Sequence, residues 1–381
     1  MRKKKLNHLI AGLSLSLVAL FTSAIAAAED GVTDSTILLG QTVGVTGPIA
    51  GAVKEMQAGA NAYFAYVNKN GGVNGRKIEL ITLDDKFDAT QAYKNAETLI
   101  KKDHVFALFQ SRGTPTSEIL FPLLNEHKIP LVAPSTGAVV MHQPLHRYVF
   151  NVRAKYQDEV RKAVEQFSTI GLKEVGIIHI DDSFGHDALE GFLAAENSFK
   201  LKPAATIKFD RLKPDVAAVV HAVKASNAKA LIIVGAAPVT ADIIKSLRAG
   251  GNTAQIMTLS NNATQGFIDS LGPHAVGIMV SQVMPAPNLA TQLGQEFKQV
   301  TKGTTVPESY SAMEGFVSAK VLVEGLKKSG RGLTRDGFVR ALESMHKNDI
   351  GGILLTYGEK DHSGSEFVEL TIINRDKKFL R

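Results

Sequence analysis

From residue 36 onward, short uninterrupted apolar runs alternate with longer segments whose apolar residues recur at helical spacing. Apolar runs without a period-two pattern are typical of parallel strands buried on both faces, and the segments between them are typical of the helices that cover such a sheet. In the first 133 residues the pattern predicts strands at 37–43, 78–83, 105–109 and 130–133, a helix that ends at 70, and helices at 88–101 and 116–126.

The same alternation starts again after residue 150. It predicts helices at 158–169, 184–197, 216–225 and 240–249, and strands at 175–180, 205–209, 230–234 and 256–259. Two runs of similar size, joined by extended segments, predict an α/β protein with two doubly wound parallel-sheet lobes. The expected bounds are 29–150 plus 281–365 for the first lobe and 151–280 plus 366–381 for the second.

The end of the chain has a different pattern. Helical spacing at 310–326 and 334–344 predicts two long helices, with Thr334 as the N-cap of the second. Residues 353–357 and 367–374 read as the two strands of a hairpin.

The first 28 residues have the order of a secretory signal peptide. Basic residues at 2–5 precede a mostly apolar run at 9–21 and a small-residue stretch that ends at Ala28. A membrane anchor is the alternative, but it needs about 20 predominantly apolar residues and this run is shorter. We expect cleavage of this signal peptide, assigned to residues 1–28, so that the mature chain starts near Ala27 or Glu29, and export of a soluble chain to a bacterial periplasm, where disulfides are optional.

Composition and charge exclude several classes of protein. The chain is 44% hydrophobic and 21% charged, which excludes disordered and fibrous classes. It has no Cys, so thiolate metal sites, cysteine nucleophiles and disulfides are excluded. Taking the four basic residues at 2–5 from the 43 in the chain leaves 39 against 37 acidic residues, a net charge of +2. We therefore expect no nucleic-acid partner.

Catalytic and cofactor motifs fail on spacing. The glycines at 44, 47 and 51 do not fit a dinucleotide-binding turn, and the chain has neither a phosphate-binding Gly-Lys pair nor a Gly-x-Ser-x-Gly elbow. The acidic and histidine residues at 181–187 are more typical of a strand end and a helix cap than of a metal site. We expect a protein that is not an enzyme and has no cofactor or metal.

Small and hydroxylic residues follow several of the predicted strands. Ligands of open parallel sheets collect beyond the carboxyl ends of the strands, where helix N-termini and backbone amides are available. For the hydroxyl residues the alternative is a capping or turn role, for Phe184 a staple of its own helix, and for Arg112 a surface ion pair, for example with Glu118. The candidate ligand-binding residues are Ser111, Arg112, Gly113, Ser135, Thr136, Gly137, Phe184, Gly235, Ala236, Ser260 and Asn261.

Five segments together resemble one known family. The sequence is similar to the leucine/isoleucine/valine-type periplasmic substrate-binding proteins of ABC transporters, over nearly the whole chain that follows residue 28. The segments are Thr46-Gly47-Pro48, Gly71-Gly72-Val73-Asn74-Gly75-Arg76, Asp84-Asp85, Gly113-Thr114-Pro115-Thr116 and Asp181-Asp182-Ser183-Phe184-Gly185.

The resemblance implies a type I binding protein whose two lobes, joined by a three-crossover hinge, close on a ligand and then dock on an ABC permease in the inner membrane. It implies that residues 111–113 and 135–137 hold a ligand carboxylate and that the second lobe closes with Phe184, 235–237 and 260–261. Two features depart from the amino-acid binders of the family. Residues 258–262 contain no acid for an ammonium group, and Ala52 stands where an aromatic residue is common.

The expected function is capture of a small carboxylate-bearing ligand, a branched-chain amino acid or a related organic acid, by a monomeric periplasmic protein. A ligand-sensing module of the same fold that feeds a signalling receptor is the alternative. Arg112 adds a cation that the family usually lacks. Its guanidinium could take the ligand carboxylate with two parallel hydrogen bonds.

Overall fold

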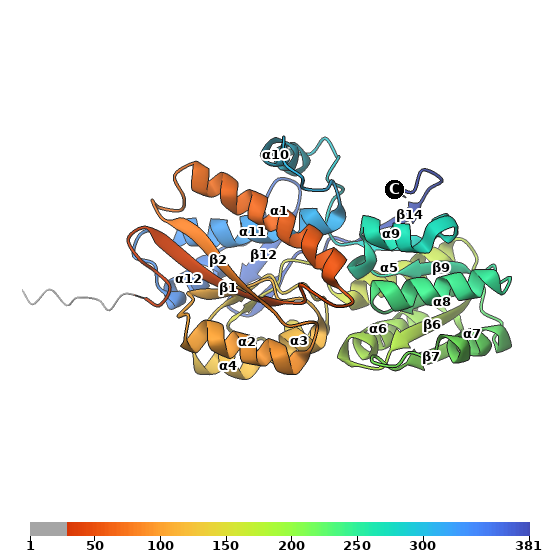
Figure 1. Cartoon of the computed structure of the whole chain (residues 1–381). Helices are drawn as coiled ribbons and strands as arrows, with labels where there is room; N and C mark the ends of the chain where they lie inside the picture. The colour runs from red at the N-terminus through yellow and green to blue at the C-terminus, as the bar shows by residue number, and fades with distance from the viewer. Residues whose placement is uncertain (1–28) are drawn as a thin grey trace, which may run out of the picture.

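The computed structural model describes residues 29–381, apart from the side chain of Lys202, and shows two lobes lying side by side (Figure 1). The expected signal peptide, residues 1–28, lies outside this range. Each lobe contains one mainly parallel sheet between two layers of helices. The two-lobed α/β fold predicted from the repeated pattern is therefore confirmed.

The first lobe has five parallel strands in the order β2-β1-β3-β4-β5. The chain leaves β1 toward β2 and returns on the other side at β3, so the loops after β1 and β3 diverge and leave a crevice at the carboxyl edge of the sheet. Helices α1, α10, α11 and α12 lie on one face and α2, α3 and α4 on the other (Figure 1).

The elements of the first lobe are β1 (Thr36–Val43), α1 (Ala50–Lys69), β2 (Lys77–Asp84), α2 (Ala89–Lys101), β3 (Ala107–Phe109), α3 (Thr114–Glu118), α4 (Phe121–Glu126), β4 (Leu131–Val132), the short 3-10 helix η1 (Val139–Met141), β5 (Val149–Phe150), α10 (Gln292–Thr301), α11 (Tyr310–Ser329) and α12 (Arg335–Glu343).

The second lobe repeats this order. Its parallel strands run β7-β6-β8-β9-β10, with a second crevice between the loops after β6 and β8. The elements are α5 (Tyr156–Thr169), β6 (Glu174–Ile180), α6 (Ser183–Phe199), β7 (Lys202–Phe209), α7 (Val216–Ala225), β8 (Ala230–Val234), α8 (Ala237–Ala249), β9 (Gln255–Thr258), the 3-10 helix η2 (Ser260–Asn262), α9 (Gln265–Leu271), the 3-10 helix η3 (Gly272–Ala275) and β10 (Met279–Gln282).

Three segments connect the lobes: the chain passes to the second sheet after β5, returns after β10 and crosses again before β14. β14 (Glu369–Ile373) pairs antiparallel with β10, and β15 (Phe379–Leu380) pairs with β14. A small separate sheet contains β11 (Asn348–Asp349), β12 (Leu354–Gly358) and β13 (Asp361–Gly364).

Two predictions about the end of the chain need correction. Residues 353–357 do not pair with residues 367–374, because a tight turn pairs β12 with β13 and leaves β14 free to join the second lobe's sheet. The lobe boundary expected at residue 281 falls inside β10, so Ser281 and Gln282 belong to the second sheet.

The helix predicted at 116–126 is two helices. Pro122 stands in the first turn of α4 and has no backbone N–H, so it cannot donate to the Glu118 carbonyl four residues earlier. The chain therefore ends α3 at Glu118 and starts again at Phe121. Thr334 caps α12 as expected, because its hydroxyl accepts a hydrogen bond from the Gly337 N–H at 3.0 Å.

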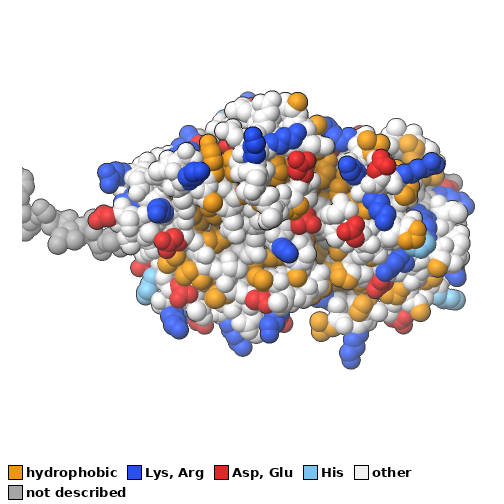
Figure 2. Space-filling view, turned by 45° about the horizontal axis from the view of Figure 1, so that its top comes forward, with side chains coloured by type: hydrophobic (Ala, Val, Ile, Leu, Met, Phe, Trp, Pro, Cys, Tyr) orange, Lys and Arg blue, Asp and Glu red, His pale blue; other side chains and the backbone are white. Residues whose placement is uncertain are grey.

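Each sheet has its own apolar core, and the largest clusters of buried apolar side chains fall one to each lobe. Among residues 29–381, no helix is long and apolar enough to cross a membrane. Figure 2 shows basic and acidic side chains interspersed over the viewed face.

Candidate functional site

A cavity of about 290 Å³ lies between the lobes, beyond the carboxyl ends of both sheets. From the first lobe it is lined mainly by the loops that follow β1 and β3, at the crevice of that sheet, with Phe87 after β2 and Ser135 after β4. From the second lobe it is lined by residues that follow β6, β7, β8 and β9, together with Tyr156 at the start of α5. The lining residues are Pro48, Ile49, Gly51, Ala52, Phe87, Arg112, Gly113, Thr114, Pro115 and Ser135 of the first lobe and Tyr156, Ile180, Phe184, Arg211, Ala236, Ala237, Pro238, Asn261, Thr264, Gly266, Phe267 and Ser270 of the second.

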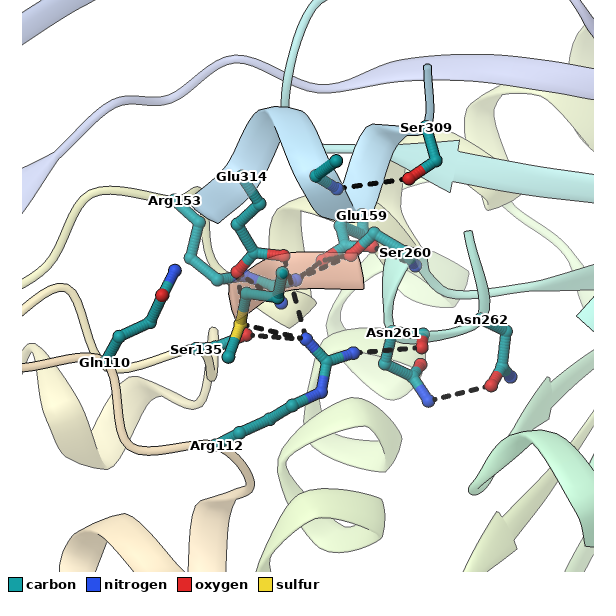
Figure 3. Close-up of polar contacts among 12 residues, drawn as sticks. Gln110, Arg112, Ser135, Arg153, Glu159, Ser260, Asn261, Asn262, Ser309 and Glu314 are labelled. Atoms are coloured by element: carbon teal, nitrogen blue, oxygen red, sulfur yellow. Dashed lines mark hydrogen bonds and ion pairs between the residues drawn. The ribbon is translucent and has the colours of Figure 1, made fainter. Parts of the chain in front are cut away.

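Arg112 spans the gap between the lobes at this cavity (Figure 3). Its Nη1 donates to the Ser135 hydroxyl at 2.9 Å and to the Met56 sulfur at 3.6 Å, both in the first lobe. Its Nη2 donates to the Asn261 carbonyl of the second lobe at 3.1 Å. Arg112 is only 4% exposed, so the surface ion pair considered from the sequence is wrong.

A network of buried charges lies next to Arg112. Glu314, on α11, accepts a hydrogen bond from the Ser135 hydroxyl at 2.7 Å and stands 3.9 Å from both Arg112 and Arg153. Arg153 bonds Glu159 and the Ser260 hydroxyl. Two arginines and two glutamates therefore balance one another in this network, as a buried site requires. Burial lowers the pKa of Arg112, and the charge of Glu314 opposes that effect.

Two features favour glycine at position 113: its backbone conformation and the adjacent Phe87 ring. Its φ is +99°, which disfavours any residue with a Cβ, and a Cβ there would lie 2.4 Å from the Phe87 ring. Phe87 itself lines the cavity and is capped by Arg211 of the second lobe, whose guanidinium lies 4.1 Å from the ring centroid. Arg211 also pairs with Asp182, the N-cap of α6.

Six of the predicted site residues line the cavity, namely Arg112, Gly113, Ser135, Phe184, Ala236 and Asn261. Phe184 is both a wall of the cavity and a packing residue, because its ring centroid lies 4.6 Å from that of Tyr156. These side chains and backbone groups come from both lobes, as a site that closes around a ligand requires.

The other five do not line the cavity. The Ser111 hydroxyl bonds Ser117 at 2.8 Å, and the Thr136 hydroxyl bonds Thr114 at 2.8 Å. Ser260 belongs to the charge network. The Gly235 carbonyl accepts from the Asn261 and Asn262 side chains. A Cβ at Gly137 would lie 2.6 Å from the Ala154 carbonyl, so that residue serves the approach of two backbone segments.

Sequence reasoning missed Tyr156, Arg211 and Phe267 as cavity residues. Arg211 and Tyr156 lie after β7 and at the start of α5, which are not loops at a sheet's crevice. Phe267 is inside α9, where an aromatic residue reads as core. The one available signal was the position of Tyr156 directly after an expected crossover.

Further contacts join the lobes around the cavity. The Ser183 hydroxyl of α6 donates to Glu118 of α3 at 2.6 Å. The Val139 N–H donates to the Asp187 carboxylate at 2.8 Å. Burial raises the pKa of Asp187 to about 6. The lobes are therefore in contact in this structure.

No group of three or more metal-ligating side chains is present among residues 29–381. Asp181 pairs with His186 at 2.8 Å and Asp182 caps α6 through the N–H groups of Phe184 and Gly185. These roles agree with the capping interpretation of the segment at 181–187.

The chain is similar to known binding proteins along most of its length. The family model described as "Periplasmic binding protein" matches residues 36–378. An amino acid binding protein of Pseudomonas aeruginosa is 25% identical over 76% of this chain and 78% of that protein. Leu/Ile/Val-binding protein homolog 3 of Brucella melitensis is 22% identical over 91% of this chain and 92% of that protein.

A solved structure agrees with these relatives. The substrate-binding periplasmic protein of Ralstonia solanacearum superimposes with a TM-score of 0.83 and 29% identity, over 90% of this chain and 99% of that one. Members of this family bind solutes and are not enzymes, in agreement with the missing catalytic motifs. The chain therefore belongs to the periplasmic binding protein family, as a type I protein of its leucine/isoleucine/valine-binding group.

Proposed function

We propose that this periplasmic binding protein is the solute-binding component of an ABC importer. It captures a small carboxylate-bearing ligand, a branched-chain amino acid or a related organic acid, between its lobes and delivers it to a permease in the inner membrane. The observation that carries the proposal is the cavity between the lobes, with the Arg112 guanidinium in its wall and apolar side chains around it.

The organisation of the chain follows from the same proposal. Residues 1–28 act as a cleaved signal peptide that directs the chain to the periplasm. The lobes have the bounds 29–150 plus 283–365 and 151–282 plus 366–381, so that β10 stays with the second sheet. The protein works as a monomer, because a ligand held between two lobes of one chain needs no second copy.

A panel of carboxylates tests the function. Protein that has been unfolded and refolded to release bound ligand is titrated calorimetrically with branched-chain amino acids and organic acids, each beside its own amide. We expect at least one acid to bind with 1:1 stoichiometry, its amide to bind much more weakly, and mass spectrometry to recover the acid unchanged. Chemical conversion of a ligand, or equal binding of acids and amides, would contradict the proposal.

A further inference from the structure

The charged groups that line the cavity have one sign. Of its lining residues in the described part of the chain, two are arginines, Arg112 and Arg211, and none is an aspartate or glutamate. A ligand that enters this cavity meets guanidinium groups and no carboxylate. Acids behind the lining, Glu314 and Asp182, balance the charges of these arginines, so the lining favours an anionic ligand group through its guanidinium N–H donors.

Arg112 keeps hydrogen-bond donors free for such a group. A guanidinium has five N–H donors, and the contacts with Ser135, Met56 and Asn261 use three of them. Nε–H and one N–H of Nη2 have no partner among residues 29–381, and Nε is not among the fully enclosed atoms that lack one. Two donors on neighbouring nitrogens fit the two oxygens of one carboxylate.

Two of the nearby acids are paired within the protein. Glu314 accepts from Ser135 and stands beside the two buried arginines, and Asp182 is paired with Arg211. Glu55, on α1 one turn beyond Ala52, does not line the cavity; one of its carboxylate oxygens is enclosed without a hydrogen-bond partner among residues 29–381, and burial raises the pKa of its carboxyl. A ligand ammonium would therefore lie near two guanidinium groups without a carboxylate partner, an arrangement that opposes binding.

The remaining walls are mostly apolar and include four rings. Phe87, Phe184, Phe267 and Tyr156 face the cavity together with proline, alanine and isoleucine side chains. A dry cavity of about 150 Å³ accommodates benzene, and this one measures about 290 Å³. The space is sufficient for one ring or a branched chain with a short arm that ends in a carboxylate.

We propose that the ligand is a monocarboxylate with an apolar, ring-sized body and no ammonium group. This inference rests on the proposed function and narrows its ligand class. Arg112 binds the carboxylate and the rings enclose the apolar body. Because no aspartate or glutamate lines the cavity, the amino acid with the same apolar body is excluded.

Matched pairs of ligands test the inference, because each pair differs only in the ammonium group. Calorimetry compares 3-phenylpropionate with phenylalanine and 4-methylpentanoate with leucine. We expect the acid without an amino group to bind at least tenfold more tightly in at least one pair. Glu55→Gln serves as a control variant and should leave this ratio unchanged, because Glu55 takes no part in the discrimination.

The outcomes separate the inference from the function. An amino acid that binds as tightly as its deaminated partner would overturn the inference and leave the solute-binding function intact. A ratio that changes tenfold in Glu55→Gln would overturn it too, since Glu55 would then be the ammonium partner. If neither acid of either pair binds at millimolar concentration, the inference also fails, whereas the function fails only if the whole carboxylate panel gives no binding.

Discussion

At the residue scale, Arg112 connects the cavity to the charge network beside it. Its Nη1 is bonded to Ser135 and Met56, and its Nη2 reaches Asn261 in the other lobe. The same guanidinium can therefore hold a ligand and join the lobes. Removing the side chain entirely would also disturb Glu314, so the informative substitution keeps the charge.

Arg112→Lys keeps a cation near Glu314 but loses the planar pair of donors. Hydrogen bonds to a charged group contribute about 1.5–3 kcal/mol, so we expect the affinity for an acidic ligand to fall about tenfold or more, with little change for its amide. Calorimetry checks this, and Arg161→Lys on the exposed side of α5 is the matched control. If the affinities for the acid and for its amide fall equally, or if neither affinity falls, other groups hold the carboxylate.

The raised pKa of Asp187 predicts that the stability of the protein depends on pH. Burial raises its pKa to about 6 in the folded protein, whereas an unfolded aspartate has a pKa near 3.9. Between these values the folded state binds more protons than the unfolded state, so this residue makes the free energy of unfolding rise as the pH falls from about 7 to about 4.

Asp187→Asn removes this proton uptake and leaves Asp85, which has a similarly raised pKa, in both proteins. Urea unfolding at pH 7.5 and pH 5 should show that the variant is more stable relative to wild type at pH 7.5 than at pH 5. An identical difference at both pH values would mean that Asp187 does not titrate in this window.

The sequence predicted several of the cavity-lining residues that follow buried strands. Arg112, Ser135 and Asn261 stand where an apolar run gives way to small polar residues, and that change is visible in the sequence. Tyr156 and Arg211 reach the cavity only because the two lobes meet there. No local pattern encodes the distance between segments that belong to different lobes, so the sequence carried no signal for Arg211 and only the nearby crossover for Tyr156.

At the element scale, α1 and α11 meet backbone to backbone. A Cβ at Gly59 would lie 1.8 Å from the Ala312 carbonyl oxygen, and a Cβ at Gly315 would lie 1.8 Å from that of Met56. This close approach brings Met56 of α1 and Glu314 of α11 to Arg112. The two helices therefore position two of the side chains that lie against Arg112.

Gly59→Ala should force these helices apart and lower the free energy of unfolding by about 1–3 kcal/mol, the usual cost of overpacking. Gly51→Ala, in the same helix but with no atom within 4 Å of the added Cβ, should stay within about 1 kcal/mol of wild type. Denaturant unfolding of both variants checks the difference. Equal stability of the two would contradict the close contact.

Strands and helices with strong patterns were predicted well, and their interruptions and pairings less well. α7 occupies 216–225 as predicted, whereas Pro122 divides the helix expected at 116–126. Proline at this position could have been read from the sequence as a break. The pairing of β14 with β10 could not, because it joins segments about 90 residues apart and no local pattern in the sequence specifies such a partner.

At the scale of the whole molecule, the two lobes have the same strand order, and the crevices of their two sheets face each other. In this structure they touch through Ser183 and Glu118 and through Arg112 and Asn261. A ligand held by both lobes favours such a closed state over an open one, because it gains contacts only when the lobes approach.

Small-angle scattering of ligand-free protein and of protein saturated with a carboxylate that calorimetry shows to bind tests this account most directly. The amide of the same acid is the control. We predict a smaller radius of gyration with the bound acid and no change with the amide. An identical scattering profile at full saturation would contradict the claim that the lobes close on a ligand held between them.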